Sequence, residues 1–157
     1  MVHYISYIKD SIGNNYLGLK IDLSIVDAYL EKLKEITGDS YNLLTNNQKN
    51  RDHGSYHITV INVVEFNNLT NNLSLNNFVN SLENTLKIKI TDLKLKGIGS
   101  AIDKIKNNIT YFIVCESKTI DNILYNYNLP KKDLHITIGF DKKDVFNSSK
   151  SEVKWFL

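Results

Sequence analysis

Leu134-His135-Ile136-Thr137-Ile138-Gly139-Phe140 repeats a motif that occurs earlier in the chain as Tyr56-His57-Ile58-Thr59-Val60. Both stretches are rich in β-branched and aromatic residues, which favour an extended conformation. Successive side chains of a strand point to opposite faces, so the histidine and the threonine of each copy share one face, joined by Gly139 in the second copy. Each predicted strand therefore offers an imidazole and a hydroxyl on one face and an apolar surface on the other.

The composition is that of an ordinary globular protein. The 157 residues, of which 42% are hydrophobic and 23% charged, are enough for a single domain over residues 1–157. The formal net charge of +2 argues against a generic nucleic-acid coat or a membrane-surface protein, but it allows a local pocket for an anion. No stretch approaches the roughly 20 apolar residues of a membrane-spanning helix, and the N-terminus does not have the pattern of a signal peptide. We therefore expect a cytoplasmic protein that needs no membrane.

Two compositional details concern redox chemistry and source. The single cysteine, Cys115, excludes an intramolecular disulfide and a cysteine-rich zinc site. Its apolar neighbours favour a buried thiol over a nucleophile. Asparagine, lysine and isoleucine are abundant and proline occurs once, which is typical of an AT-rich genome such as that of a phage or a low-GC bacterium. A phage-encoded protein would act in the host cytoplasm.

Around the two motifs the sequence predicts a mixture of strands and helices. A helix is expected from Asp22 or Ser24 to Ile36, stopped by Gly38, and the polar stretch 41–54 predicts a loop that leads into the first motif strand. Before the middle of the chain we expect strands at 2–8, 17–21 and 56–64, and a polar connection at 67–77. A helix capped by Ser74 and carrying Phe78, Val79, Leu82 and Leu86 comes next, followed by one or two strands within 87–99. The rest is expected to form a turn at 103–108, a strand at 109–116, a helix at 119–128, the second motif strand, a helical turn at 144–147 and a short strand at 153–157. This order predicts an α+β fold with helices on apolar sheet faces and a concave face left for a ligand. Each half places a motif strand late, which indicates an approximate internal duplication.

Two imidazoles on separate strands suit acid–base chemistry at a phosphate. Near neutrality one histidine can act as a base while the other acts as an acid. The threonine hydroxyls beside them can donate hydrogen bonds to phosphate oxygens, which carry more charge in the transition state than in the ground state. This chemistry requires no metal. The sequence leaves open which histidine is the base.

Other site types find less support. His53 and His57 are four residues apart, like two zinc ligands on a helix, but the second lies in a predicted strand and no His-Glu-x-x-His is present. The Gly-x-Ser-x-Gly of a nucleophile elbow does not occur. Gly97-Ile98-Gly99 is only a fragment of a phosphate-binding loop and ends a predicted strand. A single His-x-Thr would carry little weight, but two copies in matching strands favour a functional pair.

These motifs resemble those of the 2H phosphoesterase superfamily. The resemblance rests on His57-Ile58-Thr59, on Asp133 to Phe140, and on Leu93 to Gly99 followed by Tyr111-Phe112-Ile113-Val114. It implies a bilobal, pseudo-twofold α+β fold, with antiparallel sheets forming a concave cleft and helices on the outer faces. It also implies a metal-independent phosphodiesterase without a cofactor, in which His57 and His135 are the acid/base pair and Thr59 and Thr137 the phosphate donors.

The resemblance also implies a class of substrate. Members of the superfamily open 2′,3′-cyclic phosphates, process RNA ends in the manner of RNA 2′,3′-cyclic phosphodiesterases and RNA ligase-like proteins, or cleave cyclic nucleotide signals. The last group includes phage anti-defence proteins that destroy cyclic oligonucleotide messengers. We therefore expect a cyclic oligonucleotide or an RNA end as substrate, with no obligate protein partner. In a 3′–5′ linked ribonucleotide the 2′-hydroxyl could be the nucleophile, giving a 2′,3′-cyclic product.

Base recognition calls for aromatic stacking and a few polar groups. Arg51 and His53 are candidates to reach over a ligand from the loop before the first motif, and the aromatic candidates are Tyr4, Tyr7, Tyr16, Tyr111 and Trp155. The alternative from another functional class is a non-catalytic module that binds a nucleotide or an RNA end in the same cleft. Intact His and Thr at all four motif positions favour the enzyme, because a binding module does not require two titrating imidazoles.

Overall fold

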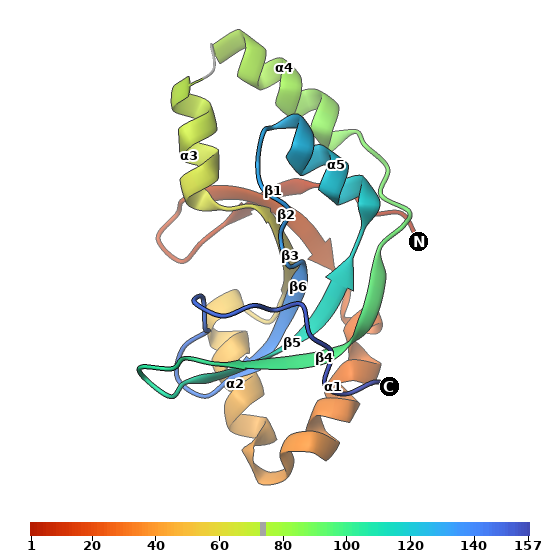
Figure 1. The fold of residues 1–157 in the computed structure, drawn as a ribbon, viewed down its shortest axis with the longest axis vertical. Helices are drawn as coiled ribbons and strands as arrows, with labels where there is room; N and C mark the ends of the chain where they lie inside the picture. The colour runs from red at the N-terminus through yellow and green to blue at the C-terminus, as the bar shows by residue number, and fades with distance from the viewer. Residues whose placement is uncertain (73–74) are drawn as a thin grey trace. The chain divides into compact units, whose positions relative to one another are not determined.

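The computed structural model describes residues 1–72 and 75–157, with residues 75, 76 and 78 described by their backbone alone. These residues form a sheet of six strands in the order β1-β2-β3-β6-β5-β4, and the β1–β2, β4–β5 and β5–β6 pairs are antiparallel. The predicted α+β fold with an antiparallel sheet is confirmed (Figure 1). The elements are β1 (Ser6–Lys9), β2 (Asn15–Ile21), α1 (Leu23–Thr37), a 3-10 turn (Gly38–Ser40), α2 (Tyr41–Asp52), β3 (Tyr56–Ile61), α3 (Val63–Asn72), α4 (Leu75–Leu86), β4 (Lys94–Ile102), β5 (Ile109–Glu116), α5 (Lys118–Asn126) and β6 (His135–Phe140).

The chain divides into two compact units. The first comprises residues 1–20, 58–93 and 117–132, and the second residues 21–57, 94–116 and 133–157. The boundary falls within the first motif, because His57 belongs to the second unit and Thr59 to the first. The second motif lies entirely in the second unit.

The first unit combines β1, most of β2 and most of β3 with α3, α4 and α5. Tyr7 of β1 meets Phe66 of α3 edge to face, with ring centroids 6.2 Å apart. The hydroxyls of Thr85 on α4 and Tyr127 after α5 lie 2.6 Å apart. Side-chain contacts thus join α3 to the sheet and α4 to the segment after α5.

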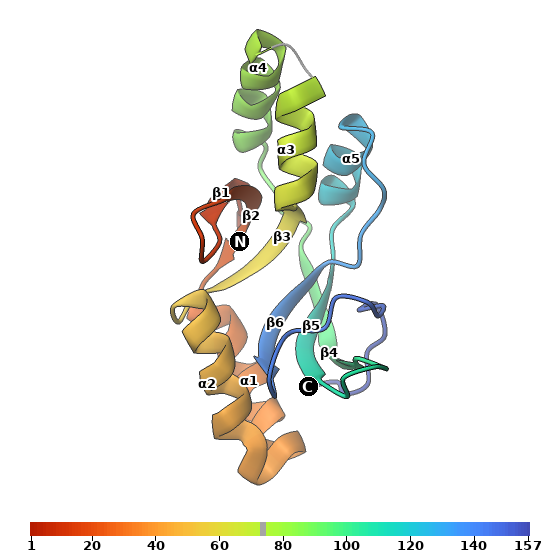
Figure 2. The same cartoon turned by 90° about the vertical axis from the view of Figure 1, so that its left-hand side faces the viewer.

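The second unit is a three-stranded antiparallel sheet with different cover on its two faces (Figure 2). Helices α1 and α2 cover one face. The opposite face is covered by the C-terminal strap, defined as residues 141–157, which ends at the outer edge of β4, where Trp155 bridges Ile98. Its Val145 and Val153 pack against Ala101, Phe112 and Val114 of the sheet. The close approach of the strap requires a glycine at position 99, since a Cβ there would lie 2.5 Å from the carbonyl oxygen of Glu152.

Helix α2 replaces the loop that the polar sequence 41–54 predicts, and that prediction is wrong. The helix is held by tertiary contacts that its composition does not reveal. Leu44 packs at the place of the missing side chain of Gly139, and Asn47 donates hydrogen bonds to the carbonyl oxygens of Phe140 and Asp141 at 3.0 and 2.7 Å. The helix ends at His53, which adopts the left-handed conformation with φ of 55°.

Other predictions fare unevenly. The helix before Gly38, the strand at 109–116, the helix near 119–128 and both motif strands are confirmed, with bounds shifted by a few residues. The connection at 67–77 is wrong over its first part, where α3 continues to Asn72, because α3 has apolar positions at helical spacing. The helical turn at 144–147 is wrong, since Asp144 turns into the sheet to make the ion pairs described below. The strand at 153–157 is reduced to one bridge between Ile98 and Trp155.

Ser74, the predicted cap of α4, lies outside the described residues. Cys115 is buried, and burial raises the pKa of its thiol to about 12, as expected of an inert core residue. Across the residues that the structure describes, every helix is too short or too polar to cross a membrane.

A bulge in β6 changes which side chains share a face. Phe112 pairs with Thr137 and Tyr111 with Gly139, so Ile138 has no partner across the β5–β6 ladder. Gly139 consequently faces Leu44 of α2 and does not share the face of His135 and Thr137, contrary to the alternation expected from the sequence. The face that carries His135 and Thr137 is the one beneath the C-terminal strap.

Candidate active site

The imidazole of His135 is held by a backbone carbonyl two residues earlier in the sequence. Its Nδ1 lies 2.7 Å from the carbonyl oxygen of Asp133, and a carbonyl oxygen can only accept, so Nδ1 carries the hydrogen. In the neutral ring Nε2 is therefore the nitrogen with the free electron pair. The carboxylate of Asp133 in turn accepts hydrogen bonds from Ser149 Oγ at 3.1 Å and from the backbone N–H of Lys150 at 3.0 Å. The strap thus supports the residue that orients His135.

The surroundings of His135 favour the neutral ring. The ring meets Phe112 edge to face with centroids 5.8 Å apart, and Val114 stands opposite His135 on β5. Burial, and next the positive charge of Lys150, lower the pKa of His135 to about 4. At pH 7 the imidazole is therefore neutral and able to accept a proton at Nε2.

Lys150 brings an ammonium group to the Nε2 side of this ring. Its Nζ lies 3.5 Å from His135 Nε2 and 3.1 Å from Asp144 Oδ1. The ammonium also lies 5.8 Å from the ring centroid of Phe112 and 5.5 Å from that of Phe146, distances at which an aromatic face attracts a cation. Lys150 as a residue is only 5% exposed, so this charge is held at one place.

Asp144 connects the strap to two other elements. Its Oδ2 accepts hydrogen bonds from Arg51 Nη1 at 2.7 Å and from Thr137 Oγ1 at 3.2 Å. Burial alone would raise the pKa of Asp144, but Lys150 and Arg51 hold that pKa well below its usual range. A buried carboxylate between two cations is therefore ionised, and it fixes Thr137 beside His135.

Arg51 forms ion pairs with two carboxylates, those of Asp52 and Asp144. It forms two hydrogen bonds with Asp52, at 2.9 and 2.8 Å, in addition to the one with Asp144. Its guanidinium group lies 5.0 Å from the ring centroid of Phe140. In this arrangement Arg51 positions Asp144, and the substrate contact expected of Arg51 from the sequence stays a prediction.

His57 stands on β3, the strand next to β6 in the order of the sheet. Burial lowers its pKa from the ordinary value, with opposing effects from Asp52 and Arg51. The charge of His57 is itself among the causes that lower the pKa of His135, so the two imidazoles interact electrostatically. Thr59 follows two residues later on the same strand, in the first unit, and has the same partial burial as His57.

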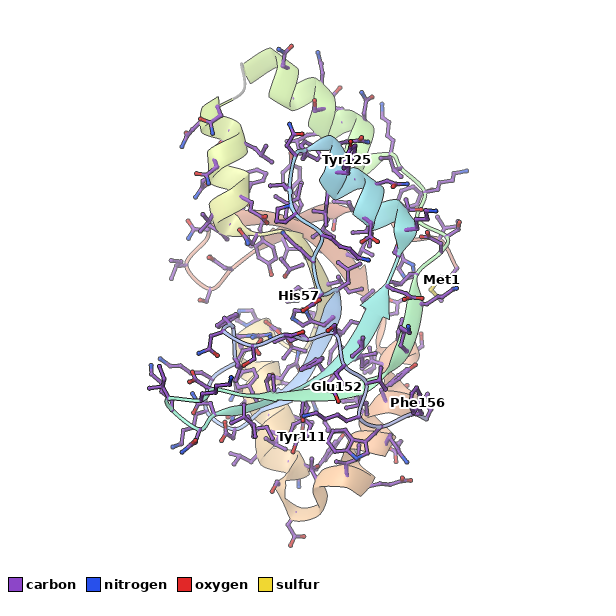
Figure 3. The ribbon with its side chains drawn as sticks, viewed as in Figure 1. Met1, His57, Tyr111, Tyr125, Glu152 and Phe156 are labelled. Carbon is purple, nitrogen blue, oxygen red and sulfur yellow. The ribbon has the colours of Figure 1, made fainter. Side chains whose placement is uncertain are left out.

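The remaining predicted contacts do not gather around His135. Tyr111 precedes Phe112 on β5 and so points to the opposite face of the sheet. Its ring tilts against that of Trp155 at 6.1 Å, and Figure 3 shows Tyr111 well away from His57. His53 is exposed at the end of α2, and Tyr4 is an exposed residue of the first unit. A substrate role for these four residues stays a prediction.

The sequence analysis missed Asp144 and Lys150. Neither belongs to a recognisable motif, and an Asp and a Lys six residues apart in a polar tail are normally solvated. No spacing rule could have found them. Among the described residues, no group of three or more His, Cys, Asp or Glu side chains is arranged to hold a metal ion.

Comparison with known families agrees with this geometry. The sequence model of the family described as "Swiss Army Knife, 2H phosphoesterase domain" matches residues 15–146, a range that includes both motifs. The chain belongs to the 2H phosphoesterase superfamily. It is accordingly a phosphoesterase, a hydrolase of phosphoric esters in general, and the resemblance seen in its motifs is confirmed. Comparisons with curated proteins and with solved structures gave no match. Lys150 lies beyond the residues that the family model matches.

Proposed function

We propose that this 2H phosphoesterase is a metal-independent phosphodiesterase that cleaves ribonucleotide phosphodiesters by paired-histidine acid–base catalysis. The observation that carries the proposal is the hydrogen bond from His135 Nδ1 to the carbonyl oxygen of Asp133. It leaves Nε2 as the proton acceptor of a ring that is neutral at pH 7, which is what a general base requires. The second imidazole, His57, interacts with it electrostatically and supplies the acid.

The reaction can be written with the substrate's own hydroxyl as nucleophile. His135 Nε2 takes the proton of the ribose 2′-hydroxyl as its oxygen bonds to phosphorus. The bond from phosphorus to the 5′-oxygen breaks, and the imidazolium of His57 gives its proton to that leaving oxygen. The products are a 2′,3′-cyclic phosphate and a free 5′-hydroxyl. In hydrolysis of a 2′,3′-cyclic phosphate, water enters and the two histidines exchange roles.

The threonines complete the proposed site. Thr137 Oγ1 donates its hydrogen to Asp144, so Thr137 would have to turn its hydroxyl toward a bound phosphate oxygen. Thr59 is retained as the second donor because it follows His57 at the spacing that keeps both on one face of a strand. Stabilising the charge on non-bridging oxygens contributes most when the donors are already in position.

Two substrate classes are consistent with this chemistry, namely cyclic oligonucleotide signals and 2′,3′-cyclic phosphates at RNA ends. The purified protein would be incubated with 2′,3′-cyclic AMP, a short RNA and several cyclic dinucleotides, in the presence of EDTA. H57A and H135A are the test variants, and Y125F, which alters an exposed residue of α5, is the control. We expect turnover that survives EDTA, is kept in Y125F and is lost by about 10²-fold or more in each test variant. Binding without turnover would favour the non-catalytic module instead, and activity abolished by EDTA would overturn the metal-free mechanism.

The division of roles has its own test. Uridine 3′-(4-nitrophenyl phosphate) has a leaving group that departs without being protonated. We expect H57A to recover most of its lost activity on this ester, because the acid is no longer needed, whereas H135A stays impaired. The reverse pattern would assign the base to His57.

A further inference from the structure

The buried ammonium group of Lys150 lies beneath the C-terminal strap, and packing alone does not explain its position. Lys150 is buried and its Nζ lies 3.5 Å from Nε2 of His135. A lysine that served only to neutralise Asp144 could do so from any direction around the carboxylate. Here the ammonium lies against the nitrogen that the proposed mechanism uses as its base.

We propose that Lys150 is a further catalytic residue, whose ammonium group binds a non-bridging oxygen of the scissile phosphate. The proposal rests on the proposed function, since it takes His135 as the group that faces the reacting phosphate. It adds a residue outside both His-x-Thr motifs and outside the range matched by the family model.

The argument begins with the place of the phosphate. The oxygen that attacks phosphorus gives its proton to Nε2 and so lies within hydrogen-bond distance of it. The other oxygens on phosphorus are two bonds away from the attacking oxygen, through phosphorus. An ammonium 3.5 Å from Nε2 is therefore within reach of a non-bridging oxygen with little movement of the side chain.

The donors of Lys150 also fit this role. An ammonium has three N–H donors, and one points to Asp144 Oδ1 at 3.1 Å. The contact with Nε2 is long for a hydrogen bond, and an incoming nucleophile must replace it if Nε2 is to accept a proton. Substrate binding thus releases a donor of Lys150 at the position where the negative charge of the phosphate arrives.

The position of the ammonium is fixed before substrate binds. Asp144, Phe112 and Phe146 contact it from the strap and from the sheet. Asp144 is shared with Arg51 at 2.7 Å, and Arg51 also pairs with Asp52, so the two cations and the two carboxylates balance in charge. The ammonium of Lys150 is the member of this group that lies against Nε2, and a cation fixed at that place stabilises developing charge without reorganisation.

The test compares K150M with K154M. Lys154 lies on the same strap but is exposed, and its Nζ contacts only Ser100 Oγ among the described residues. We expect K150M to lower kcat for the best substrate by about 10²-fold, while K154M stays within about twofold of the wild-type protein. Thermal unfolding and circular dichroism of both variants establish that the fold is kept. A folded K150M with unchanged kcat would overturn the proposal and leave the proposed function intact.

A stereochemical readout separates a phosphate contact from a structural role. The two diastereomers of uridine 2′,3′-cyclic phosphorothioate carry sulfur at one or the other non-bridging position. We expect the wild-type protein to hydrolyse them at different rates, and K150M to lose most of that difference because the contact with one position is gone. An equal difference in both proteins would count against Lys150 as the ligand of that oxygen.

A binding measurement works even if no substrate is found. Inorganic phosphate would be titrated into each protein while the ring protons of His135 are followed by NMR. Binding that K150M weakens by about tenfold or more supports the anion contact, and with no turnover of any substrate it would place the failure in the proposed function alone. Equal binding to wild-type protein and K150M would overturn the role of Lys150.

Discussion

The carboxylate of Asp144 lies 2.7 Å from the guanidinium group of Arg51, a residue 93 positions earlier in the chain. This ion pair ties the strap to α2, and Lys150 binds the other oxygen of the same carboxylate at 3.1 Å. The side chain of Asp144 is only 4% exposed. The carboxylate of Asp144 sets the position of both Thr137 and Lys150 beside His135. Its loss should therefore affect both the stability and the catalytic activity of the protein.

Replacing Asp144 with asparagine should destabilise the protein by about 3 kcal/mol, because it leaves the buried ammonium of Lys150 without a counter-charge. The loss is expected near the lower end for such pairs, since Arg51 keeps Asp52 as a partner. Urea unfolding of D144N measures it. The matched control is E116Q, which removes the exposed pair with Lys96 at 3.2 Å and should cost less than about 1 kcal/mol. Equal losses in the two variants would contradict the importance of the buried pair.

The stability of the protein should depend on pH through His135. Its folded pKa of about 4 lies below the value near 6.5 of an unfolded chain, so the unfolded state binds more protons between these two pH values. The free energy of unfolding must therefore rise with pH across this window, by up to about 3 kcal/mol, and fall as the solution is acidified. Urea unfolding at several pH values checks this, and H135N should flatten the dependence. An unchanged pH dependence in H135N would contradict the assignment to His135.

The pH dependence of kcat/KM should be a bell with an acidic optimum. The base must be unprotonated, which places the acidic limb near the pKa of about 4 of His135. The acid must be protonated, which places the alkaline limb below about 6.5, because the pKa of His57 is also lowered. A bound phosphate anion favours both imidazolium forms, so the profile of kcat should lie at higher pH than that of kcat/KM. Initial rates between pH 3.5 and 9 test this, and an optimum of kcat/KM above pH 7 would contradict it.

The contact between strap and sheet should be sensitive to one methyl group. In G99A the new Cβ would lie 2.5 Å from the carbonyl oxygen of Glu152 and 2.6 Å from the ring of Phe112. A backbone oxygen cannot move aside alone, so we expect a loss of about 1–3 kcal/mol and a lower kcat as the strap shifts with Lys150. Unfolding and kinetic measurements on G99A would be compared with K94A, which alters an exposed residue of the same strand. A G99A protein as stable and active as K94A would mean that the strap does not need this close approach.

Several features of the fold follow from local sequence patterns. Apolar residues at helical spacing predict α1, and alternating β-branched residues predict β3, β5 and β6, because these elements bury one face and the burial is visible in the period of the sequence. The wrong prediction at residues 41–54 has a long-range cause. Helix α2 is mostly polar, and its helical state depends on Leu44 filling the space at Gly139 and on Asn47 binding the end of β6, contacts that join residues more than 90 positions apart.

The sequence by itself determined the two His-Ile-Thr motifs and, through them, the superfamily and the two histidines proposed to share the acid and base roles. It could do so because strand alternation is a local rule that places each histidine and threonine on one face. Only the tertiary structure decided the tautomer of His135, its pKa and the charged residues beside it. The carbonyl of Asp133 selects the tautomer of His135, burial lowers its pKa, and the strap brings Asp144 and Lys150 to it. Charge and burial depend on neighbours in space, and a buried lysine in a polar tail has no local signature.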